Sequence, residues 1–379
     1  MRILVLIHEY PPVGGGGGRV AQDLCQGFVQ HGHEVRVLTA QCGDLPALEN
    51  QDGIEIMRLK SWRREPFRAD LRAMAGYVLA AVVRGLPLIR NWKPDVIHVH
   101  FAVPAGAAAW LLSLFSGVPY VLTAHLGDVP GGVPEKTGKW FRWIFPFTPP
   151  IWKRAAGVAA VSEFTRSLAV NSYPVNVQVI PNGVDLQLLD PDEIKPNRPP
   201  QIVFAGRFMP QKNPVQIVRT LAALQDLPWT CAMIGDGPLR ADVEQEIARH
   251  NLQERFQLPG WLTPPQVIDW YRRSDILFMP SLSEGLPVVG VQALAMGLAL
   301  VLSRVGGNID LVQPGINGDL LEPHDSQGFE SALRRWLSNP DELRKARCAS
   351  RDLAQQFDLQ KIVDAYVQLL GKASGKDKV

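Results

Sequence analysis

Short apolar runs alternate with helical segments along most of this chain of 379 residues. The first run, at residues 3–7, is followed by a glycine-rich loop, by a helix from about residue 19 to residue 31, and by a second run at residues 35–39. This order is typical of a βαβ unit, which joins two parallel strands through a helix. The alternation therefore predicts an α/β fold with parallel sheets that helices cover on both faces.

The series of strands and helices occurs twice. In the first half, further strands are expected at residues 54–59, 96–100, 120–123, 157–161 and 177–180. The second series is expected to have strands at residues 201–205, 230–234, 256–258, 276–279 and 300–303, with closing helices at 326–337 and 340–371. A proline-rich run that ends at Pro200 is typical of a linker between them. We predict two doubly wound, Rossmann-like domains, residues 1–182 and 183–358, that face each other across a cleft.

Charge and cysteine content exclude several classes of protein. The net charge is only +2, with +5 on residues 1–182 and −3 on residues 183–379, so no nucleic acid partner is expected. The four cysteines lack the spacing of a metal site or a disulfide framework, which indicates a reducing, cytoplasmic compartment. The apolar start of the chain is too short for a signal peptide. Prolines and glycines divide residues 101–124 into strand, short helix and strand, which argues against a membrane span.

The stretch around Glu284 carries the most specific chemistry. It follows the strand at 276–279 and passes through a loop into an apolar helix, with Pro287 expected in its first turn and Gly297 at its left-handed end. Backbone N–H groups at a helix N-terminus bind anions such as phosphate. A carboxylate beside such a site is suited to accept hydrogen bonds from sugar hydroxyls, which we take as the role of Glu284.

Arg207 and Lys212 share one short loop directly after the strand at 201–205. A guanidinium and an ammonium at the carboxyl end of a strand can together neutralise the two charges of a diphosphate. The alternative is an ordinary solvated loop. The neighbouring motif at Glu284 favours the diphosphate.

The first half has two candidate binding groups at strand ends. Gly16, Gly17 and Gly18 belong to a run of five glycines that allows a ligand to approach the backbone. The same loop partly fits a dinucleotide fingerprint, but no acidic residue ends the second strand, which opposes a nicotinamide site. His125 follows the strand at 120–123, where it would face the cleft, although a lone histidine is more often structural.

No metal site is expected from the remaining polar motifs. His98 and His100 alternate on one strand and lack a third ligand at metal spacing, so packing or acceptor binding is their expected role. Asp190 and Asp192 form a D-x-D, but they lie in the proline-rich linker rather than at a strand end.

Residues 136–154 interleave five cations with Trp140, Trp143 and Trp152. Basic and aromatic residues in this mixture are typical of a protein that lies on an anionic membrane, with the rings at headgroup depth. A helix that is buried on one face and solvated on the other is the alternative. Both interpretations remain open from the sequence.

The order of these motifs resembles the retaining glycosyltransferases of family 4, which have the GT-B fold. The motifs are the glycine-rich loop, His125, Pro181-Asn-Gly-Val-Asp185, Gly206-Arg207-x4-Lys212, Gly235-Asp-Gly-Pro238 and Glu284-Gly-Leu-Pro-x9-Gly297. The resemblance covers essentially the whole chain. It implies that the C-terminal helix, within residues 359–379, completes the first domain.

The resemblance also implies roles for the motif residues. Arg207 and Lys212 would hold the diphosphate of a nucleotide sugar, and Leu262 would lie near the base. Glu284 would contact sugar hydroxyls, with the amides of Gly285 and Leu286 on the sugar or phosphate. His125 and residues 16–18 would close over the donor. Family members need no metal or other cofactor, so the two cations and the helix dipole would carry the charge of the leaving group.

One position departs from the family pattern. A second glutamate usually stands eight residues after the first and contacts ribose hydroxyls, whereas this chain has Gln292 there. An amide can accept a hydrogen bond from a hydroxyl but lacks the strength of a carboxylate. Donor affinity or nucleotide preference is therefore expected to differ.

The sequence as a whole predicts a retaining, metal-independent glycosyltransferase that uses a UDP- or GDP-linked sugar. The expected acceptor is a lipid-linked or membrane-proximal glycan, with residues 136–154 against the inner face of the cell membrane. A soluble small-molecule acceptor is one alternative. The other is a catalytically weak, nucleotide-sugar-binding subunit of a glycan assembly complex, for which Gln292 is the only support.

Overall fold

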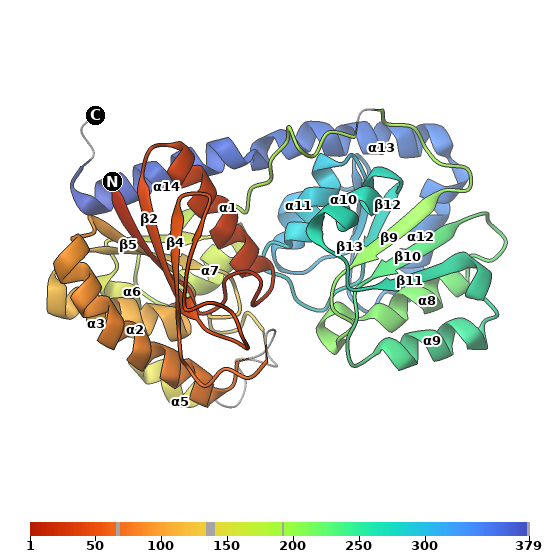
Figure 1. The fold of residues 1–379 in the computed structure, drawn as a ribbon. Helices are drawn as coiled ribbons and strands as arrows, with labels where there is room; N and C mark the ends of the chain where they lie inside the picture. Colours follow the sequence, from red (N-terminus) through yellow and green to blue (C-terminus); the bar gives the residue numbers. More distant parts are fainter. Residues whose placement is uncertain (66–68, 134–140, 192, 377–379) are drawn as a thin grey trace. The chain divides into compact units, whose positions relative to one another are not determined.

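A computed structural model describes residues 1–65, 69–133, 141–191 and 193–376 (Figure 1). The chain divides into two compact units, one of residues 1–183 with 359–379 and one of residues 184–358. The boundary expected from the sequence lies one residue earlier, between residues 182 and 183. Each unit has one mostly or wholly parallel sheet with helices on both faces, so the α/β prediction is confirmed.

The first unit contains an eight-stranded sheet in the order β3-β4-β2-β1-β5-β6-β7-β8. Its strands are β1 (Arg2–Leu6), β2 (Glu34–Ala40), β3 (Leu48–Gln51), β4 (Ile54–Leu59), β5 (Val96–His100), β6 (Tyr120–Ala124), β7 (Gly157–Ala160) and β8 (Gln178–Val179). All neighbouring strands are parallel except β3, which runs antiparallel to β4. The sequence did not predict β3, because Leu48 is its only apolar residue and the strand lies at the sheet edge.

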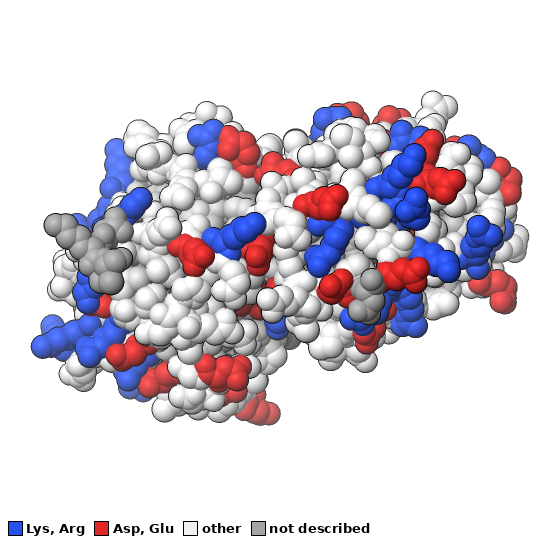
Figure 2. Space-filling model, turned by 90° about the horizontal axis from the view of Figure 1, so that it is seen from above, with Lys and Arg blue, Asp and Glu red and all other residues white. Residues whose placement is uncertain are grey.

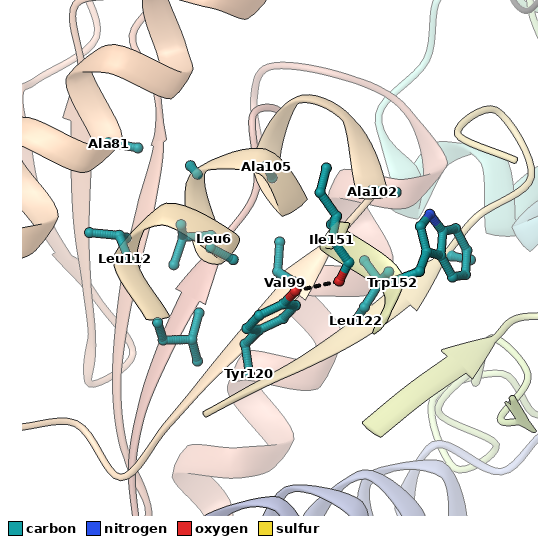
Figure 3. Packing of buried hydrophobic residues seen from close by; sticks show 14 of the residues in the cluster. Leu6, Ala81, Val99, Ala102, Ala105, Leu112, Tyr120, Leu122, Ile151 and Trp152 are labelled. Carbon is teal, nitrogen blue, oxygen red and sulfur yellow. Dashed lines mark hydrogen bonds between the residues drawn. The ribbon is translucent and has the colours of Figure 1, made fainter. Parts of the chain in front are cut away.

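Helices cover both faces of this sheet. They are α1 (Gly16–Gln30), α2 (Leu71–Trp92), the π-helical turn η1 (Ala102–Gly106), α3 (Ala107–Ser116), α5 (Phe141–Ile144), η2 (Phe145–Phe147), α6 (Pro149–Arg154), α7 (Glu163–Ser172) and α14 (Leu359–Ser374). Figure 3 shows Leu6, Val99 and Leu122 of the strands packed against residues of α3 and α6. On the other face α14 packs against α1, where a Cβ on Gly27 would lie 2.3 Å from Val363. Residues 101–124 contain η1, α3 and β6, so the predicted short helix and second strand are confirmed, whereas the predicted first strand is wrong because β5 ends at His100.

The second unit contains six parallel strands in the order β11-β10-β9-β12-β13-β14. They are β9 (Gln201–Ala205), β10 (Thr230–Ile234), β11 (Phe256–Gly260), β12 (Ile276–Met279), β13 (Ala299–Ser303) and β14 (Gly318–Leu321). The helices are η3 (Pro210–Lys212), α8 (Pro214–Ala222), α9 (Arg240–Arg249), η4 (Gln253–Arg255), α10 (Pro264–Arg272), α11 (Val288–Ala295), η5 (Gly306–Leu311), α12 (Ser326–Ser338), α13 (Pro340–Leu353) and η6 (Ala354–Phe357). On the face in Figure 2, basic and acidic side chains alternate over this unit, as on a solvated surface.

Two predicted helices differ from the structure. The helix expected at 340–371 is divided into α13 and α14, because Asp358 is extended and the preceding carbonyl, of Phe357, accepts a hydrogen bond from Val184 N at 2.9 Å. The helix expected from Arg19 begins three residues earlier, at Gly16, so the glycines themselves form its first turn.

A buried ion pair holds the start of β12 in the second unit. Asp275 is fully buried and contacts Arg347 of α13 through Oδ1. Asp275 Oδ2 also accepts hydrogen bonds from Gln201 N and from Asn197 Nδ2, both at 2.8 Å. Arg347 Nε donates to Gly297 O at 2.8 Å. This network joins the linker, two strands and α13 at one point.

Replacing Asp275 by Ala is expected to lower the free energy of unfolding of the second unit by about 3–5 kcal/mol, because Arg347 would remain buried without a counter-charge. Urea denaturation followed by circular dichroism measures this change. The matched control is Asp226→Ala, which breaks an exposed ion pair with Arg334 and should leave the midpoint unchanged. Equal midpoints for the two variants would contradict the prediction.

Candidate active site

Two loops of the second unit meet at the carboxyl ends of neighbouring strands. One follows β9 and contains residues 206–213, and the other follows β12 and contains residues 280–287. The chain leaves β9 toward β10 on one side, while β12 lies on the other side. A crevice at such a switch point is where doubly wound sheets bind their ligands.

Hydrogen bonds fix the two loops against each other. Leu282 N donates to Gln211 O at 2.7 Å, and Gln211 Nε2 donates to Ser283 O at 2.8 Å. These contacts place the side chains of Lys212 and Glu284 together, with Lys212 Nζ 2.6 Å from Glu284 Oε1. Two predicted site residues that are 72 positions apart in the chain therefore form one ion pair.

The Lys212–Glu284 pair is largely removed from water. Glu284 is 5% exposed, and the Lys212 side chain is 18% exposed. Taking a carboxylate out of water is costly unless a cation compensates it, and Lys212 supplies that cation. The Lys212 stem passes over Gly206, where a Cβ would lie 3.8 Å from Lys212 Cδ. Arg207 is half-buried on the same loop, five residues before Lys212.

Glycines allow a third loop to approach Glu284, which the sequence analysis missed. A Cβ on Gly306 would lie 1.6 Å from Glu284 O, and one on Gly307 would lie 1.8 Å from Gly285 O. Gly307 N donates to Glu284 O at 3.2 Å. Any larger residue would displace the loop that carries Glu284. The sequence does contain a sign of this contact. The Gly-Gly pair begins three residues after the strand expected at 300–303, and glycine is common where two backbones come close together.

The other predicted donor-binding residues lie in loops or helices at the same edge of the sheet. Gly285 and Leu286 precede α11, and Gln292 is a half-buried residue within it. Pro287 has an extended ψ of 119°, so it precedes the first turn of α11 rather than lying within it as predicted. Gly297 has the expected left-handed φ of +64°. Leu262, half-buried, follows β11.

In the first unit, His125 is half-buried at the end of a row with two fully buried histidines, His98 and His100. His125 Nε2 is 3.0 Å from His100 Nδ1, and the His98 and His100 rings are 4.3 Å apart. His98 Nε2 is 3.0 Å from Thr123 Oγ1, which donates to the Tyr366 hydroxyl of α14 at 3.3 Å. The row thus links His125 to the C-terminal helix.

Burial keeps these histidines neutral. It lowers the pKa of His98 and of His125 to about 3, and it places the pKa of His100 well below its ordinary value. A hydrogen bond between two imidazoles requires one ring to donate and the other to accept, so His100 and His125 cannot both be charged. Among the described residues, no hydrogen bond reaches Nδ1 of His125.

Phe101 joins the glycine-rich loop to His125. Its ring centroid is 4.5 Å from that of His125, and a Cβ on Gly17 would lie 2.5 Å from Phe101 Cζ. A Cβ on Gly18 would lie 2.8 Å from Glu9 O, while Gly16 is exposed at the start of α1. Phe101 has a φ of +72°, which is unusual for a bulky residue and often marks a functional site. The sequence analysis did not single out Phe101.

The aromatic side chains of the basic and aromatic segment at 136–154 differ in their burial. Trp152 is fully buried and stacks on Tyr173 with ring centroids 4.4 Å apart, so of the two interpretations the buried one holds for this residue and the place at headgroup depth does not. It packs in the core because α6 covers the sheet. Trp143 and Phe147 are 81% and 76% exposed. Trp140 lies outside the described residues, as does Asp192 of the D-x-D motif.

Within the described ranges, no three His, Cys, Asp or Glu side chains are placed to hold a metal ion. His98, His100 and His125 are instead used in hydrogen bonds and ring contacts with one another and with Thr123. Asp190 Oδ1 lies 3.9 Å from Arg351.

Comparison with known proteins identifies the family. Residues 14–188 match the family described as Glycosyltransferase Family 4, and residues 187–352 match Glycosyl transferases group 1. The chain is a family 4 glycosyltransferase. The two matches together span every predicted site residue of this glycosyltransferase.

Individual relatives of the glycosyltransferase differ in what they make. Glycogen synthase of Mycobacterium tuberculosis is 28% identical, over 97% of this chain and 94% of the relative. An Escherichia coli enzyme named UDP-Gal:alpha-D-GlcNAc-diphosphoundecaprenol alpha-1,3-galactosyltransferase is 27% identical, over 65% of this chain and 67% of its own. Relatives at this level of identity show the enzyme class and leave the substrate open.

Solved structures show the GT-B fold of the glycosyltransferase. Sucrose-phosphate synthase from Thermosynechococcus elongatus has a TM-score of 0.84 at 20% identity, and the match covers 97% of this chain and 98% of that one. Anabaena HepE in complex with UDP and glucose has a TM-score of 0.78 at 20% identity, with 98% and 99% covered. The predicted GT-B fold is confirmed.

The neutral histidines predict that acid destabilises the first unit. An unfolded histidine binds a proton below about pH 6.5, whereas His98 and His125 stay neutral in the folded state until about pH 3. Stability is therefore full above pH 6.5 and falls as the pH is lowered, by about 2 kcal/mol per histidine at pH 5. Hydrogen exchange of the slowest β5 amides at pH 7.5 and pH 5 measures the loss. His98→Gln should show a smaller loss between the two pH values than the wild type, and an equal loss would refute the assignment.

Proposed function

We propose that this glycosyltransferase transfers a sugar from a UDP- or GDP-linked donor to a lipid-linked or membrane-proximal glycan, with retention of configuration and without a metal. The observation that carries the proposal is the Lys212–Glu284 pair, buried at the carboxyl ends of β9 and β12 and directly before α11. A cation, a carboxylate and helix N–H groups are together the set that a nucleotide sugar needs.

Donor binding would give the charged groups of Lys212 and Glu284 new partners. Lys212 would leave Glu284 for a phosphate oxygen, with Arg207 as the second cation, and Glu284 would accept hydrogen bonds from the sugar hydroxyls in place of the ammonium. Both charges would have a partner before and after the donor binds. The exchange would therefore cost little free energy. The two cations and the N-terminus of α11 would then stabilise the charge of the leaving diphosphate, so no metal is required for that purpose.

Retention is proposed to follow the front-side path that the family resemblance implies. The bond from the anomeric carbon to the phosphate oxygen breaks, and the acceptor oxygen bonds to the same face of that carbon. The acceptor hydroxyl gives its proton to the departing phosphate oxygen, which balances the step without a protein nucleophile. His125, neutral and with Nδ1 directed away from His100, is proposed as a hydrogen-bonding partner of the substrate.

The comparisons support parts of this proposal. The name of the Escherichia coli relative specifies a UDP-sugar and a diphosphoundecaprenol acceptor, and the Anabaena structure contains UDP. Both favour a nucleotide sugar as donor, and the first favours a lipid-linked acceptor. A relative named 2-deoxystreptamine glucosyltransferase, from Streptomyces kanamyceticus, favours a small-molecule acceptor as the second candidate.

The test begins with a thermal-shift screen against UDP-, GDP- and ADP-sugars, because a ligand at 100 times its Kd adds about 2.7 kcal/mol to apparent stability. With the donor identified, Glu284→Ala and Arg207→Ala should each reduce turnover by at least about a hundredfold, since each removes a charged contact to the transition state. Arg249→Ala, an exposed charge on α9, is the control and should retain turnover. Near-normal rates in both site variants would refute the site.

Gln292 should set donor affinity. Gln292→Glu restores a carboxylate that can accept charge-assisted hydrogen bonds from ribose, so donor Kd should change by up to roughly tenfold, which is about 1.4 kcal/mol. Isothermal titration with the donor nucleotide measures it. An unchanged Kd would mean that this amide does not contact the ribose.

A further inference from the structure

Helix α2 lies on the outside of the first unit (Figure 1). A row of exposed apolar side chains runs along it. The row consists of residues spaced four apart, which lie along one ridge of a helix, and every member is exposed: Leu71, Ala75, Leu79, Val83 and Pro87. Leu79 and Val83 are each 60% exposed. The usual surface of a solvated helix is polar or charged, so this row is the reverse of the expected pattern.

The opposite face of α2 is firmly attached to the domain. The Tyr77 hydroxyl, fully buried, donates to Leu38 O of β2 at 2.9 Å. A Cβ on Gly85 would lie 2.9 Å from Leu112, which shows how closely α2 packs on α3. The exposed row is therefore presented by a fixed helix, capped at Asp70 by a hydrogen bond from Ala73 N at 2.8 Å.

The apolar surface continues from α2 onto α3. Leu114 and Phe115 of α3 are 48% and 64% exposed. Phe115 also lines a pocket of about 360 Å³ with Leu86 and Arg90 of α2. We call the exposed residues Leu71, Leu79, Val83, Leu114 and Phe115 the apolar face.

Every charge on these two helices is positive. Arg72, Arg84 and Arg90 are exposed on α2, Lys93 follows as its left-handed cap, and neither α2 nor α3 contains Asp or Glu. The exposed acid next to these helices in the chain is Asp70, the cap of α2, against four cations. An apolar face with an excess of cations suits a surface that is apolar inside and negative outside. A second copy of the chain is disfavoured, since an isologous contact would bring four cations of each copy together with only Asp70 as an acid on α2.

We propose that the apolar face docks on an anionic lipid bilayer, with its side chains at the acyl boundary and Arg72, Arg84, Arg90 and Lys93 on the headgroups. Among the described residues, α2 is the one helix long and apolar enough to cross a membrane, but a third of its apolar window is buried inside the unit. A helix already packed on a sheet would have to leave the domain to span, so α2 lies in the plane of the membrane surface. This docking is independent of the glycosyl transfer proposed above and of the exposed aromatics at Trp143 and Phe147.

Flotation of the full chain with vesicles tests the proposal. Binding is expected to vesicles of phosphatidylglycerol and phosphatidylcholine at low salt, and much less to phosphatidylcholine alone. A Leu79→Ser, Val83→Ser, Phe115→Ser variant should lower the partition coefficient at least about tenfold, because it removes exposed apolar area. Arg84→Gln with Arg90→Gln should lower it by about fivefold for each cation.

The matched control removes exposed apolar side chains elsewhere, in a Leu48→Ser, Leu188→Ser, Ile316→Ser variant, and should bind as the wild type does. A Trp143→Ser, Phe147→Ser variant tests the segment at 136–154 separately. The proposal is overturned if the wild type does not bind anionic vesicles, or if the apolar-face variant binds equally well. It is also overturned if sedimentation velocity shows self-association that this variant abolishes. The flotation and sedimentation experiments do not measure turnover. A negative result in them would therefore not contradict the proposed reaction.

Discussion

The pairing of β9 with β12 is the constraint on which the candidate active site depends. These strands are parallel and adjacent, although the chain forms β10 and β11 between them. Their carboxyl ends therefore open at one place, and the loops that follow lie side by side. Lys212 and Glu284 meet for this reason. Because the pair is buried, each charge needs a partner at all times, which makes the site suited to a ligand that carries both an anion and hydroxyl groups.

Glycines and buried polar groups keep this arrangement in place. Gly306 and Gly307 let a third loop touch the backbone of Glu284 and Gly285, so the position of the carboxylate is set from three strands. At the other end of the same strands, Asp275 and Arg347 tie β12 to the linker and to α13. The unit is thus fixed at both ends of the sheet, and the loops with the charged residues are supported by rigid elements.

The first unit holds its polar residues differently. His98, His100 and His125 lie in a row that desolvation keeps neutral, and Phe101 adopts a positive φ between His125 and the glycine-rich loop. The outside of this unit, by contrast, leaves large apolar side chains of α2 and α3 exposed. The proposed substrate contacts and the proposed docking surface therefore use different parts of this unit, the first the ends of its strands and the second two helices that cover the sheet.

The sequence by itself determined the α/β class, the strand ends that carry charged residues, and the kind of chemistry, because hydrophobic periodicity and motif spacing are local properties. It also gave the residue types of the site, Arg207, Lys212 and Glu284. It could not give the ion pair between two of them, the close approach of Gly306, or the edge strand β3, since these depend on which strands become neighbours. The sequence could not predict which side chains are buried either. Trp143 and Trp152 occur in one segment, yet Trp143 is exposed and Trp152 is in the core. The same holds for α2, whose apolar residues look alike in sequence, while packing on β2 and α3 decided which of them face away from the protein.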